Sequence, residues 1–267
     1  MTDFTQTDST RERITSIRKG SESYTKCLTE ITLNSHESFK RIKKVDPSKK
    51  IDDYVLIRAD SRDEFFEVID HFEGIADDEK SGREILETKG KGQETHTEDS
   101  RSAMGRGMSD VLFRFINQPS IVAWRRNGQT FAYIAQWIKN PSDGKLERKY
   151  LDQRQKNPQL VKKIEDLIPN TGTYVKFSWK EDNEQQTFPT KNDIKEHLGY
   201  YFELKNVLSG NEFSYNLEYV NQDGTVDNDR IRFVEYDVTE VAALGKRPLD
   251  KIKLDHLKAK CTCWHDQ

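Results

Sequence analysis

Apolar residues recur with a helical spacing in several parts of the chain. From Tyr24 to Phe39 their period is close to 3.6 residues, which predicts an amphipathic helix with one face packed on a core. The basic run at 40–44 favours the end of this helix, because cations are stabilised near a helix C-terminus. Similar spacings predict further helices at 104–115, 158–168 and 193–208.

Alternating apolar and polar residues predict the strands, which short polar turns connect. Two strands are expected at 54–59 and 64–69, and Asp70 follows the second of them. Asn127-Gly128 is the strongest hairpin signal in the chain, and it is expected to join strands on either side of it. The remaining strands are predicted at 120–125, 130–138, 171–179, 212–221 and 229–235.

The order of these elements predicts an α+β protein with helices on one face of a mixed, mostly antiparallel sheet. The segment 76–102 is polar, irregular and interrupted by glycines, which is typical of a lid or a binding loop. The composition of the sequence becomes strongly polar near residue 182, where the stretch EDNEQQ is typical of a linker. We therefore expect two domains, 1–182 and 183–267, the second being an incomplete α+β domain.

Composition narrows the class of protein. The chain has 267 residues, of which 10% are aromatic, and these supply enough apolar area for real cores. The formal net charge of −3 creates no overall positive field toward nucleic acid. Cys27, Cys261 and Cys263 are too few for a disulfide framework, which indicates a reducing, cytoplasmic setting. The sequence contains no apolar run long enough to span a membrane.

Glu30 and Asn34 are the first candidates for chemistry. They stand four residues apart on the first predicted helix, so both side chains project from the same face. A carboxylate in this position can act as a base for water, and a carboxamide oxygen can bind Mg²⁺. Pairs with this spacing are also common on solvated helix faces, so the pair alone does not establish a site.

A second group of residues suits the recognition of a flat base. Asp70 at a strand end can accept a hydrogen bond from an exocyclic amine. Gly74, with Ile75 beside it, allows the backbone to approach a base closely. Thr173, next to Gly172 on a later strand, adds a hydroxyl near the base. An ordinary exit from a strand into a turn would also explain Asp70 and Gly74.

A third segment suits phosphates. The turn Gly105-Arg106-Gly107 opens a predicted helix at Met108, and its backbone amides can bind anions. Loop chemistry alone would also explain such a turn. Taken together, the order of the three groups along the chain favours one nucleotide pocket over several coincidences.

These motifs resemble those of the GHKL-type ATPases. This Bergerat-fold superfamily includes type II topoisomerases, MutL mismatch-repair proteins, MORC proteins, the ninety-kilodalton heat-shock chaperone and histidine kinases. The resemblance covers roughly residues 10–180. It matches E-x-x-x-N and a small residue at Glu30, Asn34 and Ser35, D-x-G-x-G at Asp70 and Gly74, G-x-x-G-x-G at Gly105 and Gly107, and a strand G-T pair at Gly172 and Thr173.

The chain departs from the family pattern at two positions. Phe72 stands at the first glycine of D-x-G-x-G, and Ser102 stands at the first glycine of the lid motif. These changes bear on nucleotide affinity and on lid closure. Glu30 is present where histidine kinases lack a catalytic glutamate, so the resemblance favours hydrolysis over phosphoryl transfer to histidine.

The resemblance implies an ATP-dependent conformational switch. Mg²⁺-ATP would bind under a lid at about residues 76–108, with Glu30 activating water and Asn34 holding the metal. Slow hydrolysis, lid closure and homodimerisation would serve a larger protein or complex, in DNA repair or anti-phage defence for example. In the dimerising branch a transducer-like domain follows and sends a lysine to the γ-phosphate, and no motif selects between Lys246 and Lys251.

Other interpretations stay open. Phe72 and Ser102 also fit a degenerate nucleotide-binding or protein-interaction module without significant hydrolysis. A DNA-processing subunit would suit the fold, although neither the net charge nor a basic motif supports it directly. Near the end of the chain, two or three zinc ligands, short of the usual four, are offered by Cys261, Cys263 and His265.

Overall fold

The computed structural model divides the chain into two compact units, Met1–Phe233 and Val234–Gln267. The first unit contains a large sheet with its helices, and the second contains a two-stranded sheet. The structure describes residues 4–6, 24–49, 54–87, 107–179, 187–199, 204–208, 214–233, 247–254 and 259–265.

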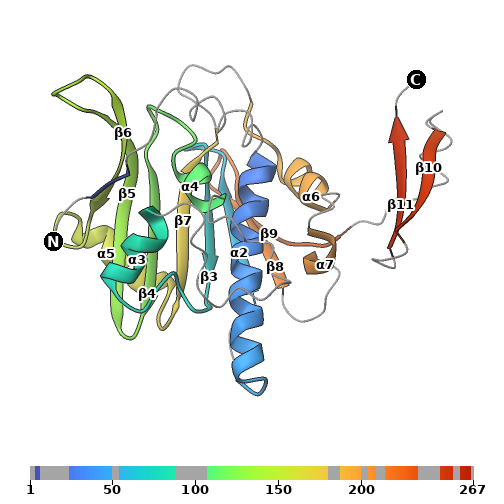
Figure 1. Ribbon diagram of the computed structural model, residues 1–267, viewed down its shortest axis with the longest axis horizontal. Coiled ribbons are helices and arrows are strands. Elements are labelled where there is room, and N and C mark those ends of the chain that lie inside the picture. Colours follow the sequence, from blue (N-terminus) through green and yellow to red (C-terminus); the bar gives the residue numbers. More distant parts are fainter. Residues whose placement is uncertain are drawn as a thin grey trace. The chain divides into compact units, whose positions relative to one another are not determined.

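The first unit is built on one sheet of nine strands (Figure 1). In chain order these are β1 (Phe4–Gln6), β2 (Tyr54–Asp60), β3 (Phe65–Asp70), β4 (Ser120–Arg126), β5 (Gln129–Lys139), β6 (Leu146–Asp152), β7 (Gly172–Ser178), β8 (Ser214–Val220) and β9 (Val226–Ile231). Across the sheet they lie in the order β1-β6-β5-β4-β7-β3-β2-β8-β9. Only β2 and β8 pair in parallel within this described sheet. The protein is thus a mixed α+β protein with a mostly antiparallel sheet, as the sequence predicts.

Two hairpins confirm predicted turns. β2 and β3 pair antiparallel across residues 61–64, and β4 and β5 pair across Asn127-Gly128. Asn127 and Gly128 have φ angles of 52° and 74°, the left-handed conformation that a tight hairpin turn requires and that these residue types tolerate. The same pairing places Asp70 at the end of β3, directly opposite Thr173 of β7.

The long helix α2 (Tyr24–Val45) covers one face of the sheet (Figure 1). Its Leu28 and Ile31 are buried in the main core together with Phe66 of β3. The short helix α4 (Gly107–Leu112) contributes to the same core. The predicted amphipathic helix is therefore confirmed, and its apolar face is the one that meets the sheet.

The helix α5 (Pro158–Leu167) packs on the opposite face. Its Leu160 and Ile164 form a separate core with Ile69 and Tyr174. These strand residues point away from the α2 side, because successive side chains of a strand alternate between faces. Helices therefore cover both faces, and the prediction of helices on one face only is wrong for α5.

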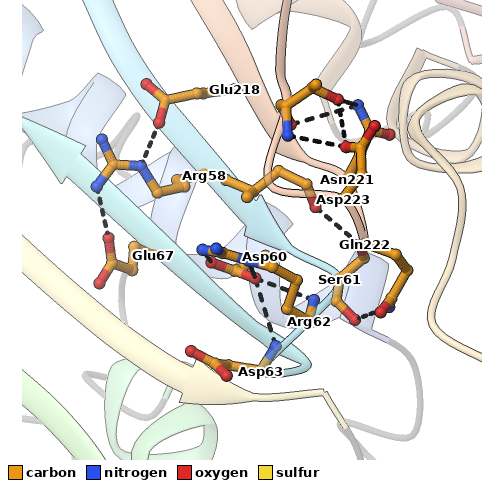
Figure 2. A network of polar contacts seen from close by, with 12 residues as sticks. Arg58, Asp60, Ser61, Arg62, Asp63, Glu67, Glu218, Asn221, Gln222 and Asp223 are labelled. Atoms are coloured by element: carbon orange, nitrogen blue, oxygen red, sulfur yellow. Dashed lines mark hydrogen bonds and ion pairs between the residues drawn. The ribbon is translucent and has the colours of Figure 1, made fainter.

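A buried carboxylate, Glu67 of β3, ties α5 to this second face. Its Oε1 accepts hydrogen bonds from Lys163 Nζ at 2.5 Å and from the Tyr174 hydroxyl at 2.6 Å. Its Oε2 accepts from Arg58 at 3.1 Å, and Arg58 also pairs with Glu218 of β8 (Figure 2). Burial by itself raises the pKa of Glu67, but these donors outweigh it and hold the pKa below its ordinary value of 4.5.

A helix occupies part of the segment that the sequence predicts to be irregular. α3 (Glu79–Glu87) has a buried Leu86, and Gly82 faces Trp124 so closely that a Cβ would lie 2.3 Å from the ring. The contact face consists of a glycine and a leucine, so no broad apolar stripe marks this helix in the sequence. Residues 88–106, the rest of the predicted lid, lie outside the described residues.

The main sheet continues beyond the expected linker. β8 pairs with β2 along its whole length, from Tyr54 opposite Ser214 to Asp60 opposite Val220. β8 and β9 therefore belong to the first sheet, and the first compact unit ends at Phe233. The polar stretch in the sequence predicts a domain boundary after residue 182 instead. The same unit includes the helices α6 (Lys191–Gly199) and α7 (Lys205–Leu208).

The second unit is an antiparallel pair, β10 (Arg247–Leu254) and β11 (Ala259–His265). Lys251 lies on β10, and Cys261, Cys263 and His265 lie on β11, while Lys246 is outside the described residues. Within the described parts of the chain, none of the helices combines the length and the apolar character that crossing a membrane requires.

Candidate functional site

Asp70 is a focal point of hydrogen bonds in the predicted site. The residue is 4% exposed, and its Oδ2 accepts a hydrogen bond from the Ser35 hydroxyl at 2.6 Å. Its Oδ1 accepts from the backbone amides of Phe72 at 3.2 Å and Thr173 at 3.1 Å. Burial raises the pKa of Asp70, and the hydrogen bonds oppose this rise because they favour the charged form. Donors from α2, the turn after β3, and β7 thus converge on one carboxylate.

Two glycines allow close backbone approaches at Asp70 and in the turn that follows it. A Cβ built on Gly172 would lie 2.0 Å from the backbone carbonyl oxygen of Asp70. Gly74 has a φ of +75°, and its Cβ would lie 3.1 Å from the carbonyl oxygen of Arg125. At Gly172 the close approach requires glycine, and at Gly74 the left-handed backbone favours it.

The turn at 70–74 is fastened to α2. The backbone amide of Glu73 donates to the Ser38 hydroxyl at 3.1 Å, and Arg41 Nε donates to Glu73 Oε2 at 2.8 Å. Ser35 holds Asp70 from the same helix. The helix that carries Glu30 and Asn34 therefore also positions the turn.

Phe72, which departs from the glycine of the family pattern, is a core residue. Its side chain is fully buried and meets Phe39 of α2 edge-on, with the ring centroids 5.6 Å apart. The aromatic ring thus adds an apolar anchor between the turn and α2, on the side of the main core.

Glu30 lies beside the first residue of α4. A Cβ on Gly107 would come 2.2 Å from Glu30 Oε2 and 3.0 Å from its Cδ, so the carboxylate group fills the space next to this backbone. Glu30 and Asn34 are both half-buried on the continuous helix α2, and their spacing places them on one face. Residues far apart in the sequence, Glu30 and Gly107, are therefore neighbours in the fold.

The other predicted residues divide into two groups. Ile75 and Met108 are partly buried and pack against the main core. Gly105 and Arg106 lie outside the described residues, as does Ser102. The structure therefore places Thr173 beside Asp70, the turn with Gly74 against Gly172, and Gly107 beside Glu30.

Two further residues of the site are not evident from the sequence pattern. Ser35 fills only the small-residue position of the first motif, yet its hydroxyl donates to Asp70. Tyr215 of β8 is buried, and its pKa is raised first by burial and then by the negative charge of Asp70. Tyr215, Val55 and Asp70 lie in register across β8, β2 and β3. A strand signal at 212–221 was available, but the parallel pairing that brings Tyr215 here has no local signature.

The described side chains include no cluster of three or more His, Cys, Asp and Glu residues suited to a metal. Mg²⁺ that arrives with a nucleotide needs no such cluster, because it takes one or two protein oxygens and completes its shell with phosphates and water. Asn34 offers an oxygen of this kind, on the same face of α2 as Glu30. The predicted residues thus include a buried acceptor, Asp70, and a half-buried carboxylate, Glu30. No protein-family model and no curated protein matches the chain.

Proposed function

We propose that this protein binds Mg²⁺-ATP and hydrolyses it slowly, as the GHKL-type ATPases that its motifs resemble do. The observation that carries the proposal is the buried carboxylate of Asp70, on which three donors from separate segments converge. Carboxylates with a burial-shifted pKa concentrate at functional sites. A Bergerat-type arrangement of the sheet and its helices, lid closure over residues 76–108 and homodimerisation belong to the same proposal.

Asp70 would recognise the exocyclic amine of adenine. The two oxygens of a carboxylate offer about four acceptor positions. Oδ1 receives two of the three donors and Oδ2 receives one, so Oδ2 has capacity for another N–H. Thr173, opposite Asp70 on β7, and Gly74 with Ile75 in the following turn would complete the base end of the site.

Glu30 would act as the base. Its carboxylate adjoins Gly107, and we assign the phosphates to the segment that contains Gly105, Arg106, Gly107 and Met108. Glu30 would accept a proton from water as the water attacks the terminal phosphorus, while the bond from that phosphorus to the bridging oxygen breaks and ADP leaves. Asn34, one turn along α2, would be the protein ligand of Mg²⁺, whose charge would stabilise the phosphate oxygens.

Calorimetry with ATP and Mg²⁺ tests binding, and a phosphate-release assay tests turnover. Asp70→Asn is expected to lower ATP affinity by about tenfold or more, because a hydrogen bond to a charged acceptor is worth about 1.5–3 kcal/mol. Glu30→Gln is expected to retain ATP binding and to lose about 10²–10⁴-fold in turnover.

Glu165→Gln is a matched control on α5, which packs on the face of the sheet opposite α2. The Glu165 side chain is exposed and accepts a hydrogen bond from the Thr130 hydroxyl. This variant is expected to change neither binding nor turnover. Wild-type turnover in Glu30→Gln would contradict the role of Glu30. A protein that fails to bind ATP at millimolar concentration would instead be a degenerate interaction module.

A further inference from the structure

We infer that Arg148 is a positioning residue, which holds α4 in place and thereby keeps Gly107 beside Glu30. Arg148 lies on β6, and its side chain is only 2% exposed. The guanidinium stays charged at any physiological pH, so its burial requires groups that compensate the lost hydration. Several of these groups belong to α4 or to the residue that follows it.

Two successive residues of α4 face the guanidinium. Arg148 Nη1 donates to Ser109 Oγ at 2.9 Å in a buried hydrogen bond, and Nη2 lies 3.9 Å from Asp110 Oδ1. Hydrogen bonds from a charged donor are stronger than neutral ones, especially away from water. α4 is six residues long, and a helix of this length depends on tertiary contacts for its stability. Arg148 provides such a contact in the middle of the helix.

Aromatic side chains fix the end of α4 to the same guanidinium. Its central carbon lies 5.1 Å from the ring centroids of both Phe113 and Trp137. Phe113 directly follows α4, and its carbonyl accepts a hydrogen bond from Trp137 Nε1 at 3.0 Å. Cation–π contacts gain strength when they are desolvated, as they are here. The guanidinium therefore joins α4 to β5 and β6.

This anchor is two residues away from the backbone that adjoins Glu30. Gly107 begins α4, and Ser109 in the same turn receives the hydrogen bond from Arg148. A misplacement of about 1 Å at a reacting group can cost about 10²-fold in rate. On the proposed ATPase function, loss of the anchor should therefore lower kcat. The KM for ATP should rise by a smaller factor, because the segment assigned to the phosphates includes Gly107 and Met108 of α4, whereas the base end is built from β3, β7 and α2.

The first measurement is hydrogen–deuterium exchange without nucleotide, on wild type, Arg148→Met and Arg148→Lys. Arg148→Met is expected to speed exchange of the amides at 107–112 by about tenfold or more, while β3 keeps its protection. Arg148→Lys keeps the charge but loses the planar donor pair, so its exchange rate at 107–112 should lie between those of wild type and Arg148→Met. If Arg148→Met does not fold, the experiment uses Ser109→Ala instead, because this variant removes only the hydroxyl that accepts the hydrogen bond from Arg148.

The second measurement is steady-state hydrolysis by the same proteins. Arg148→Met is expected to lower kcat by about 10²-fold and to raise KM by a smaller factor, about tenfold or less, through the phosphate segment at the start of α4. The matched control is Arg58→Met, which removes a partly buried guanidinium that pairs with Glu67 of β3 and Glu218 of β8 (Figure 2). This control should lose stability without changing kcat or the exchange of α4.

The outcomes separate this inference from the proposed function. Unchanged exchange at 107–112 in Arg148→Met overturns the inference, whether or not the wild type hydrolyses ATP. Faster exchange with an unchanged kcat in an active protein overturns the positioning role. A wild type that neither binds nor hydrolyses ATP refutes the proposed function alone, and the exchange data then still decide whether Arg148 anchors α4.

Discussion

Gly107→Ala tests the neighbourhood of Glu30 without removing any functional group. The added Cβ would lie 2.2 Å from Glu30 Oε2, whereas ordinary contact begins near 3.4 Å. The carboxylate must therefore retreat by roughly 1 Å to restore normal van der Waals distances. The displaced atoms are the far end of a flexible side chain, and alanine is a better helix former than glycine. We therefore expect the free energy of unfolding to change by less than about 1 kcal/mol.

The effect on turnover should be much larger. A shift of about 1 Å in a positioned catalytic group costs about 10²-fold in rate, which corresponds to about 2.7 kcal/mol of activation free energy. ATP affinity should fall by a smaller factor, about tenfold or less, because Gly107 belongs to the segment assigned to the phosphates while the Asp70 end of the site is unchanged. Phosphate release at saturating Mg²⁺-ATP, calorimetric binding and urea unfolding on one preparation measure all three quantities.

Gly128→Ala is the control for a glycine replacement. Gly128 has a φ of +74° in the hairpin between β4 and β5, and its added Cβ would meet nothing within 4 Å. It should lose about 1–2 kcal/mol of stability through backbone strain and keep its turnover. The reasoning is refuted if Gly107→Ala hydrolyses ATP at the wild-type rate, or if both variants lose turnover equally.

Three further predictions concern stability and the base end of the site. Gly172→Ala should lower the free energy of unfolding in urea by more than about 3 kcal/mol, because its Cβ would meet backbone rather than a side chain. Glu67→Gln should cost about 1–3 kcal/mol at pH 7, because a buried charged acceptor is lost while the half-exposed Lys163 can be solvated by water. Since the pKa of Glu67 is lowered in the fold, its stabilisation is complete above about pH 4.5 and is lost as the pH falls through the lower folded value, so the acid dependence of wild-type unfolding should weaken in the variant. Ser35→Ala should raise the pKa of Asp70 further and weaken calorimetric ATP binding, with an unchanged kcat at saturation.

Local signals predicted much of the fold. The hairpin at Asn127-Gly128 and the amphipathic helix at 24–39 depend on short-range chemistry, and the structure has both. The face on which α5 packs depends on the direction from which the chain returns to the sheet, and the apolar spacing of a helix does not contain that direction. α3 was not predicted from the sequence, because it contacts Trp124 through Gly82, a residue that does not favour a helix.

The candidate site was predictable as a set of residues and less so as an arrangement. Strand-end position marked Asp70, and helical spacing marked Glu30 with Asn34. The contact of Glu30 with Gly107 arises from the packing of two helices, which neither segment encodes alone. Phe72 looked like a disturbance of a glycine motif, but its ring packs on Phe39 in the core, a pairing that only the tertiary fold reveals.

The parallel pairing of β2 with β8 has a consequence for biosynthesis. About 160 residues separate the paired positions, since Tyr54 lies opposite Ser214, so this pairing belongs to the slow, non-local class of folding events. Until the ribosome has released β8, one edge of β2 has no strand to cover its backbone amides and carbonyls, and such edges recruit other chains. A fragment cut after residue 182 would keep that edge permanently and should aggregate, whereas one that ends at Phe233 retains the covering strand.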